Sequence, residues 1–331
     1  MYHLLMQANP YSNLNFFQFL WQLFIRAALF IMGKIPFDQL ATDEIQVGVL
    51  AGIAISSAMV GCFLILRRMT MLANSLSHTL LMGIVFAYFF STNKQMGSGA
   101  SMQAMIVASL IMGFITAFLT EFLSQTAKLQ EDASLGLVFT TFFALGIVLA
   151  TLLTRSAHIG IEAVMGNADA LVLSDLWWVY SVLFFNAILY LFFFKEFALT
   201  SFDSSLAVAL GFSPIFFNYL LMVQVSITSI TAFRAVGVLL VLAFMTGPPL
   251  TARLLTHSLL KMVLGGAIIG VISAILGVAI TRHMWTVYGM ALSTSGVVVC
   301  TIFFLYFAVA FFTPGRGLLS QMRKGRLSSL S

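Results

Sequence analysis

The sequence predicts an all-α, polytopic membrane protein with about eight to ten transmembrane helices, because 331 residues hold that many spans of about 20 residues each with short loops. Hydrophobic residues make up 60% of the chain and charged residues 8%, and the mean hydropathy is +1.03. Water-soluble domains do not tolerate this balance. Little chain is left between the apolar runs, so we expect one membrane domain.

The predicted spans follow directly from apolar runs long enough to cross a bilayer. Together they define a predicted transmembrane domain over residues 45–315. The expected helices lie near 45–66, 72–91, 102–123, 134–154, 176–195, 215–233, 235–255, 260–281 and 291–312.

The N-terminal segment 1–44 contains a further apolar run near 14–33. Arg26 lies deep within this run and its flanks are polar, so the run either lies along the membrane surface or forms one extra span. We favour the interfacial arrangement. At the other end, residues 316–331 form a basic tail.

The distribution of basic residues predicts the orientation. Placing Asp43 and Glu44 outside and alternating the spans leaves far fewer Lys and Arg residues outside than inside, as the positive-inside rule requires. The tail is then cytoplasmic and the 155–174 loop faces outward. The cytoplasmic set is Arg67, Arg68, Lys128, Lys195, Arg253, Lys261, Arg316, Arg323, Lys324 and Arg326, and the outer set is Lys94, Arg155, Arg234 and Arg282.

Asn74 and His78 are polar residues at the start of a predicted span, where such residues are costly and often functional. Four residues apart on a helix, they project from one face and could offer an oxygen and an imidazole nitrogen to one ion. The two are therefore candidate metal ligands. The alternative is that His78 is only hydrogen-bonded within the bundle.

The cytoplasmic connection 196–214 is predicted to contain a short helix. Asp203 or one of the two serines after it can cap its start, and Gly211 can end it. Leu206 and Ala207 contribute to an apolar face. That face is covered either by a partner or by the membrane domain itself.

The sequence also excludes several functions. No stretch fits the phosphate-binding pattern G-x-x-x-x-G-K-[ST], so any ATPase that drives this chain must be another polypeptide. No H-E-x-x-H motif occurs and no G-x-S-x-G stands on a plausible strand-to-helix turn, which argues against an enzyme. The basic residues are scattered at helix ends and indicate no nucleic-acid partner.

Five separated pieces, in order, resemble the permease subunits of bacterial zinc, manganese and iron importers of the ATP-binding-cassette type. The resemblance covers roughly residues 45–315. The pieces are Gly61–Met69 with Ser75–His78; Glu131–Gly136; Gly166-Asn167; Ser201–Asp203 with Leu206, Ala207 and Gly211; and Ala235–Gly237 with Pro248 and Ala252.

The resemblance implies a multi-pass permease in a bacterial cell membrane, the inner membrane in a Gram-negative organism. Its implied partners are membrane lipid, a second permease, identical or related, a cytoplasmic ATPase and an extracytoplasmic metal-binding protein. The chain binds no cofactor of its own; it passes manganese, iron or zinc while the ATPase uses ATP. Asp203, Leu206, Ala207 and Gly211 are the implied ATPase-coupling residues.

One departure from the family signature and one alternative function qualify this assignment. The family signature has aspartate where this chain has Asn74, so the metal site should be weaker than the family norm, and a sister permease that keeps the aspartate would make the pathway asymmetric. The alternative function is an ion-coupled secondary transporter that works without an ATPase. On the outer side, the 155–174 loop with Asp169 is expected to receive the metal-binding protein.

Overall fold

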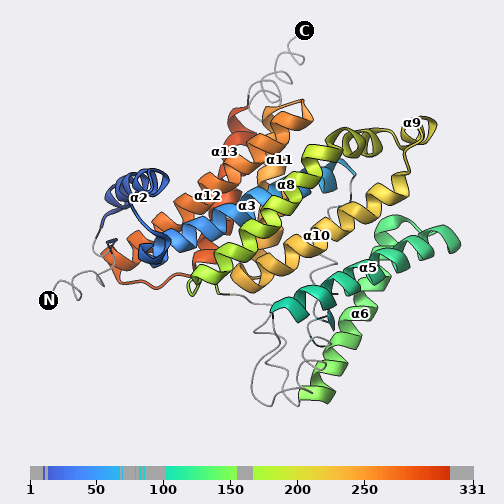
Figure 1. The fold of residues 1–331 in the computed structure, drawn as a ribbon, viewed down its shortest axis with the longest axis horizontal. Coiled ribbons are helices and arrows are strands. Elements are labelled where there is room, and N and C mark those ends of the chain that lie inside the picture. Colours follow the sequence, from blue (N-terminus) through green and yellow to red (C-terminus); the bar gives the residue numbers. More distant parts are fainter. Residues whose placement is uncertain are drawn as a thin grey trace, which may run out of the picture.

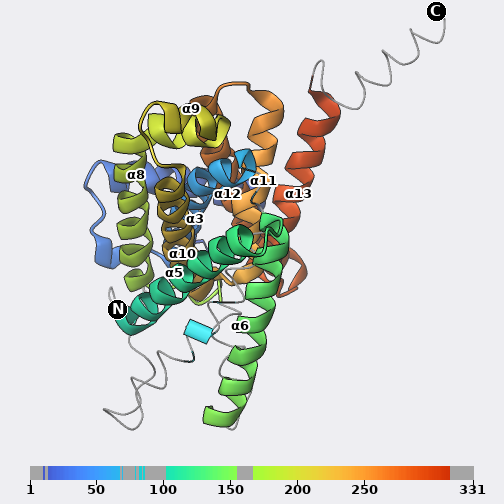
Figure 2. The ribbon, with the colours of Figure 1, turned by 90° about the vertical axis from the view of Figure 1, so that its right-hand side faces the viewer.

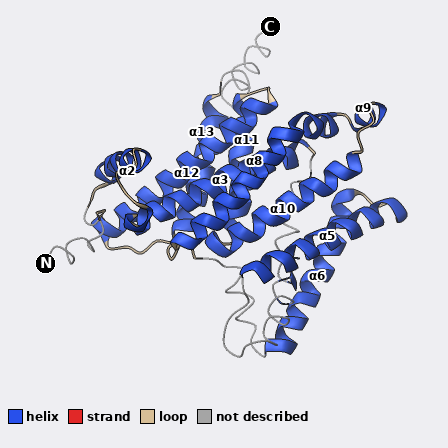
Figure 3. Cartoon of the chain, in the orientation of Figure 1, coloured by secondary structure: helices blue, strands red, loops and turns tan. Residues whose placement is uncertain are grey.

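The computed structural model describes residues 10–11, 14–67, 69, 79, 82–83, 85, 102–154 and 167–313, and this part of the chain is helical without a strand (Figure 3). The predicted span 72–91 and the tail 316–331 lie almost wholly outside it. The elements are α2 (Phe16–Ile31), the 3-10 turn η1 (Phe37–Gln39), α3 (Thr42–Leu66), α5 (Met102–Thr126), α6 (Glu131–Thr154), α8 (Leu173–Phe202), α9 (Ser204–Ala209), α10 (Pro214–Val236), α11 (Val238–Leu255), α12 (Leu259–Tyr288) and α13 (Thr294–Phe312).

Six of the described helices are long and apolar enough to cross a membrane, namely α3, α8, α10, α11, α12 and α13. Two others, α5 and α6, contain the shorter apolar stretches Ile111–Ser124 and Ala133–Leu149. The prediction of an all-α polytopic membrane protein is therefore confirmed. Each of these helices overlaps a span predicted from hydropathy.

The centre of the bundle is α3, the most deeply buried of the six candidate spans. It packs against α8, α10, α11 and α12 (Figure 1). Small residues allow these close approaches: a Cβ at Gly270 would lie 3.1 Å from the Cβ of Ala54, and one at Gly266 would lie 3.5 Å from that of Ala58. Such contacts are typical of helix packing in membranes, where lipid is as apolar as the protein interior.

The hairpin of α5 and α6 stands at one side of this bundle. Its helix α5 packs against α10, and α6 packs against α5 (Figure 2). Phe114, Phe118 and Phe122 on α5 are exposed. This flank of the hairpin therefore presents an apolar surface.

The structure corrects the predicted start of the 196–214 connection. Residues 196–202 continue α8, which is 30 residues long and has non-helical dihedral angles at Phe193 (φ −114°, ψ 19°). Hydropathy falls at Lys195 and Glu196, but a helix does not have to end where its apolar run ends. Pro214 is the first residue of α10, a position where a missing N–H costs nothing.

The N-terminal helix α2 runs across the bundle, and Figure 1 shows it nearly end-on beside α3 and α12. Arg26 of α2 forms an ion pair with Glu44 of α3, and the hydroxyl of Tyr11 donates a hydrogen bond to the same carboxylate at 2.7 Å. These bonds fix the segment to the start of α3. A crossing orientation suits a helix that lies in the membrane interface, which stays a prediction.

The helices alternate in direction, so the bundle has two polar ends. We call them the Asp43 end, where α3 and α13 begin and α12 finishes, and the Arg67 end, where α3 and α8 finish and α10 begins. The short helix α9 lies at the Arg67 end (Figure 1).

Candidate functional site

Asp203 starts the short helix α9 at the Arg67 end. Its carboxylate accepts hydrogen bonds from the backbone N–H groups of Ser205 and Leu206, both at 3.0 Å, and from the Ser205 hydroxyl at 2.5 Å. These bonds hold the pKa of the Asp203 carboxyl below its usual range, the Ser205 hydroxyl having the largest effect. The predicted N-cap is therefore present, although Asp203 itself is exposed to solvent.

Gly211 ends α9 with a φ of +86°. Its N–H bonds the Val208 carbonyl at 3.0 Å, and the N–H of Phe212 reaches back to the Ala207 carbonyl at 2.9 Å. This pair of bonds around a left-handed residue is the Schellman arrangement, which favours glycine. Six residues are thus held as a defined helical turn by signals at both ends.

The exposed side of α9 is apolar. Ala207 is fully buried toward the bundle, whereas Leu206, Val208 and Leu210 are 47%, 61% and 59% exposed. Ala207 therefore packs the helix onto the bundle, and its coupling role stays a prediction. The exposed apolar side chains on and beside α9, which we call the α9 apolar surface, are Phe202, Leu206, Val208, Leu210, Phe212, Ile215 and Phe216.

Arg67 links the end of α3 to both flanks of α9. Its Nε donates to the Ser201 hydroxyl at 2.9 Å and its Nη2 donates to the Thr200 hydroxyl at 2.8 Å. Its Nη1 donates to the side-chain carbonyl of Asn218 on α10. One guanidinium therefore joins α3, α8 and α10 next to the short helix.

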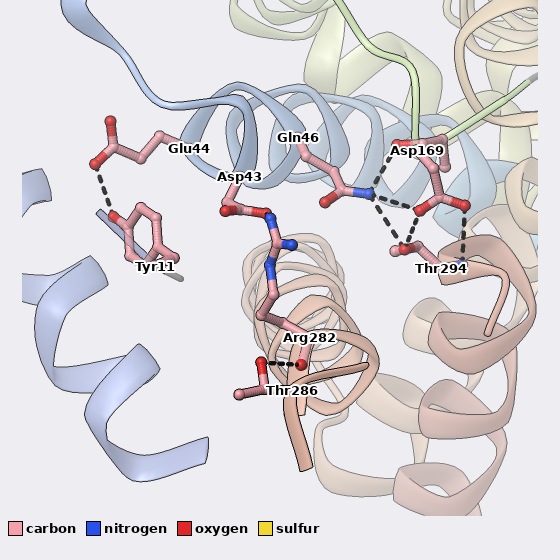
Figure 4. A network of polar contacts seen from close by, with 9 residues as sticks. Tyr11, Asp43, Glu44, Gln46, Asp169, Arg282, Thr286 and Thr294 are labelled. Atoms are coloured by element: carbon pink, nitrogen blue, oxygen red, sulfur yellow. Dashed lines mark hydrogen bonds and ion pairs between the residues drawn. The ribbon is translucent and has the colours of Figure 1, made fainter. Parts of the chain in front are cut away.

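A second polar network lies at the Asp43 end (Figure 4). The Gln46 amide donates to the Ala168 carbonyl at 2.8 Å, and to Asp169 and the Thr294 hydroxyl, both at 3.2 Å. Thr294 in turn donates to the Asp169 carboxylate. The network ties the loop before α8 to the starts of α3 and α13, so Asp169 has a structural role besides the docking role expected for its loop.

Asp43 and Arg282 form an ion pair beside this network, between α3 and α12. Both line a cavity of about 320 Å³ that Gln46, Asp169 and Thr294 also border. Carboxylate, amide and hydroxyl oxygens thus lie close together at the Asp43 end. The Asp43 carboxylate is paired with the guanidinium of Arg282.

The two predicted metal ligands, Asn74 and His78, lie outside the described residues, as does Gly166. Within the part of the chain that the structure describes, no cluster of three or more His, Cys, Asp or Glu side chains could hold a metal ion. The metal site stays a prediction.

Sequence reasoning did not find the contacts of Arg67, Gln46 or Arg282. In the sequence, both arginines indicate orientation and Arg67 also belongs to the Gly61–Met69 piece, but their partners Ser201 and Asp43 are 134 and 239 residues away in the chain. One signal was available, because Gln46 interrupts the start of an apolar run and must find hydrogen-bond partners there.

Comparison with known proteins identifies the family. The model of the ABC 3 transport family matches residues 41–313. The chain is 39% identical over 298 residues to a "Probable metal transport system membrane protein" of Chlamydia muridarum, covering 90% of this chain and 92% of that protein. It is 34% identical over 290 residues to a manganese transport system membrane protein of Halalkalibacterium halodurans, covering 87% and 91%.

A solved structure also matches. PsaBC from Streptococcus pneumoniae, in complex with a Fab, superimposes with a TM-score of 0.70 and 26% identity, covering 89% of this chain and 99% of that one. The resemblance read from five sequence pieces is therefore confirmed, and this chain belongs to the ABC 3 transport family of membrane proteins.

Proposed function

We propose that the chain is the permease of an ATP-driven importer of divalent metal ions, and that its ATPase partner docks on the α9 apolar surface. The observation that carries this proposal is the exposure of Leu206, Val208 and Leu210 on a helix capped at both ends. Because α9 lies outside the candidate spans, an exposed apolar patch on it indicates a contact with another protein or with the membrane surface.

The nature of the partner follows from the chain and its family. The sequence has no nucleotide-binding motif, while the family is one of ABC transport proteins. The Arg67 end is cytoplasmic by the distribution of basic residues, so ATP is available on the side where α9 lies. A separate ATPase is the partner that fits both facts.

The transported ion is a divalent transition metal, and Mn²⁺ is the first to test because a relative is named a manganese transport protein. Asn74 and His78 would be the metal ligands of the pathway, and iron and zinc suit the same ligand types. A metal-binding protein would deliver the ion at the Asp43 end, near the loop that carries Asp169.

Co-purification from detergent tests the ATPase assignment. Leu206→Glu places a carboxylate in the apolar surface, and we expect it to weaken ATPase binding roughly thirtyfold or more, the effect of losing a residue central to an interface. Leu206→Met keeps volume and polarity and should bind like the parent. Equal ATPase binding by both variants would contradict docking on α9, whereas a parent chain that binds no ATPase would favour a secondary transporter.

A further inference from the structure

We propose that Arg67 is a positioning residue that transmits movement of α9 to the central helix α3 and thereby couples ATP use to transport. The proposal rests on the proposed function, since it assumes an ATPase that moves α9. Beyond that function, the proposal identifies Arg67 as the side chain that transfers the movement of α9 to the bundle.

The geometry places one planar group against both flanks of α9. Thr200 and Ser201 stand in the last turn of α8, just before the Asp203 cap, and Asn218 stands in the second turn of α10. The guanidinium donates to all three. A displacement of α9 that carries the end of α8 or the start of α10 must therefore move Arg67 or break its hydrogen bonds.

The two hydroxyls are oriented to accept hydrogen bonds. The Thr200 hydroxyl donates its own hydrogen to the Glu196 carbonyl at 2.8 Å, and the Ser201 hydroxyl donates to the Phe197 carbonyl at 2.6 Å. Each hydroxyl therefore has only lone pairs left for Arg67. A guanidinium supplies several N–H groups in a fixed fork, which a lysine ammonium cannot reproduce at three separate acceptors.

The central helix α3 is suited to pass the movement on. Arg67 directly follows its last residue, and α3 contacts α8, α10, α11 and α12. A shift of this helix changes its packing with most of the bundle. The chain from Arg67 also continues toward Asn74 and His78, the predicted metal ligands.

A purely structural role is the competing explanation. If Arg67 only holds the fold, its loss should lower the yield of assembled complex while the surviving complexes import the usual amount of metal per ATP. If Arg67 couples ATP hydrolysis to metal transport, a complex that lacks Arg67 should still assemble and hydrolyse ATP. The ratio of metal imported to ATP hydrolysed should then fall.

The test uses the reconstituted complex of permease, ATPase and metal-binding protein in vesicles, with Mn²⁺ as the probe. For Arg67→Gln and for Asn218→Leu we expect parental ATPase binding and a ratio of Mn²⁺ imported to ATP hydrolysed about tenfold lower, since each loses a hydrogen bond to a charged group. Arg67→Lys should be intermediate. The double variant should be no worse than the lower single one, because both changes act on one contact.

Lys261→Gln is the matched control, since it removes one exposed positive charge from the first turn of α12 at the same end of the bundle. Its ratio should equal that of the parent. A parental ratio in either Arg67→Gln or Asn218→Leu overturns the proposal, and so does loss of ATPase binding in Asn218→Leu. If Arg67→Gln fails to assemble, Asn218→Leu decides. A parent that binds the ATPase but imports no Mn²⁺ instead contradicts the proposed function.

Discussion

A single exposed carboxylate begins the helix that carries the proposed docking surface. Asp203 is held by two backbone N–H groups and one hydroxyl, and these bonds lower its pKa. Asparagine is an equally good N-cap, whereas alanine has no side-chain acceptor. We therefore expect Asp203→Ala to weaken ATPase binding several-fold and Asp203→Asn to preserve it, as measured by titration of the ATPase in detergent.

The lowered pKa also predicts how binding responds to pH. A carboxylate whose folded-state pKa is depressed stabilises the fold above its unfolded pKa of about 4 and stops doing so only as the pH falls through the lower folded value. Asp203 should therefore leave ATPase binding constant between about pH 5 and pH 8. A change in that window that Asp203→Asn removes would contradict this role.

The ion pair of Asp43 and Arg282 gives a second prediction about side chains. Asp43 is buried, so removing its guanidinium partner leaves a poorly compensated carboxylate in the bundle. Arg282→Gln should lower the free energy of unfolding by up to about 4 kcal/mol. Adding Asp43→Asn should recover at least half of that loss, because the double variant has no buried charge at this site. Thermal unfolding in detergent, with Lys261→Gln as control, checks this; additive losses would contradict it.

Among the elements, α3 and α11 approach each other closely at Gly61. A Cβ at Gly61 would overlap the backbone carbonyl oxygen of Met245, and a backbone atom cannot move aside as a side-chain end can. Gly61→Ala should therefore lower the free energy of unfolding by about 1–3 kcal/mol or more. Gly136 of α6 is the matched control, since a Cβ there meets nothing within 4 Å and alanine is the better helix former. If Gly61→Ala unfolds at the parental temperature, α3 and α11 do not pack as described.

The existence of the elements was predictable, and some of their ends were not. Apolar runs locate the spans because the bilayer requires them. They do not mark where α8 ends, since it continues through Lys195 and Glu196 to Phe202. The caps of α9 were readable because Asp203 and Gly211 act on neighbouring backbone. The contacts of Arg67 with Ser201 and of Gln46 with Thr294 join residues 134 and 248 positions apart, and no local spacing encodes them.

At the scale of the whole molecule, the two polar ends of the bundle differ in structure. The Asp43 end holds the Gln46 network and the Asp43–Arg282 ion pair, whereas the Arg67 end holds the capped helix α9 with its apolar surface. This asymmetry fits a permease that receives its ion on one side and its energy on the other.

Uptake of radioactive Mn²⁺ into vesicles that hold the permease with its ATPase, and with the metal-binding protein outside, tests the central claim most directly. We expect accumulation only when ATP reaches the ATPase, unchanged by a protonophore, and lost in Leu206→Glu but kept in Leu206→Met. Accumulation by the permease alone, without ATP and abolished by the protonophore, would contradict the account and identify an ion-coupled transporter.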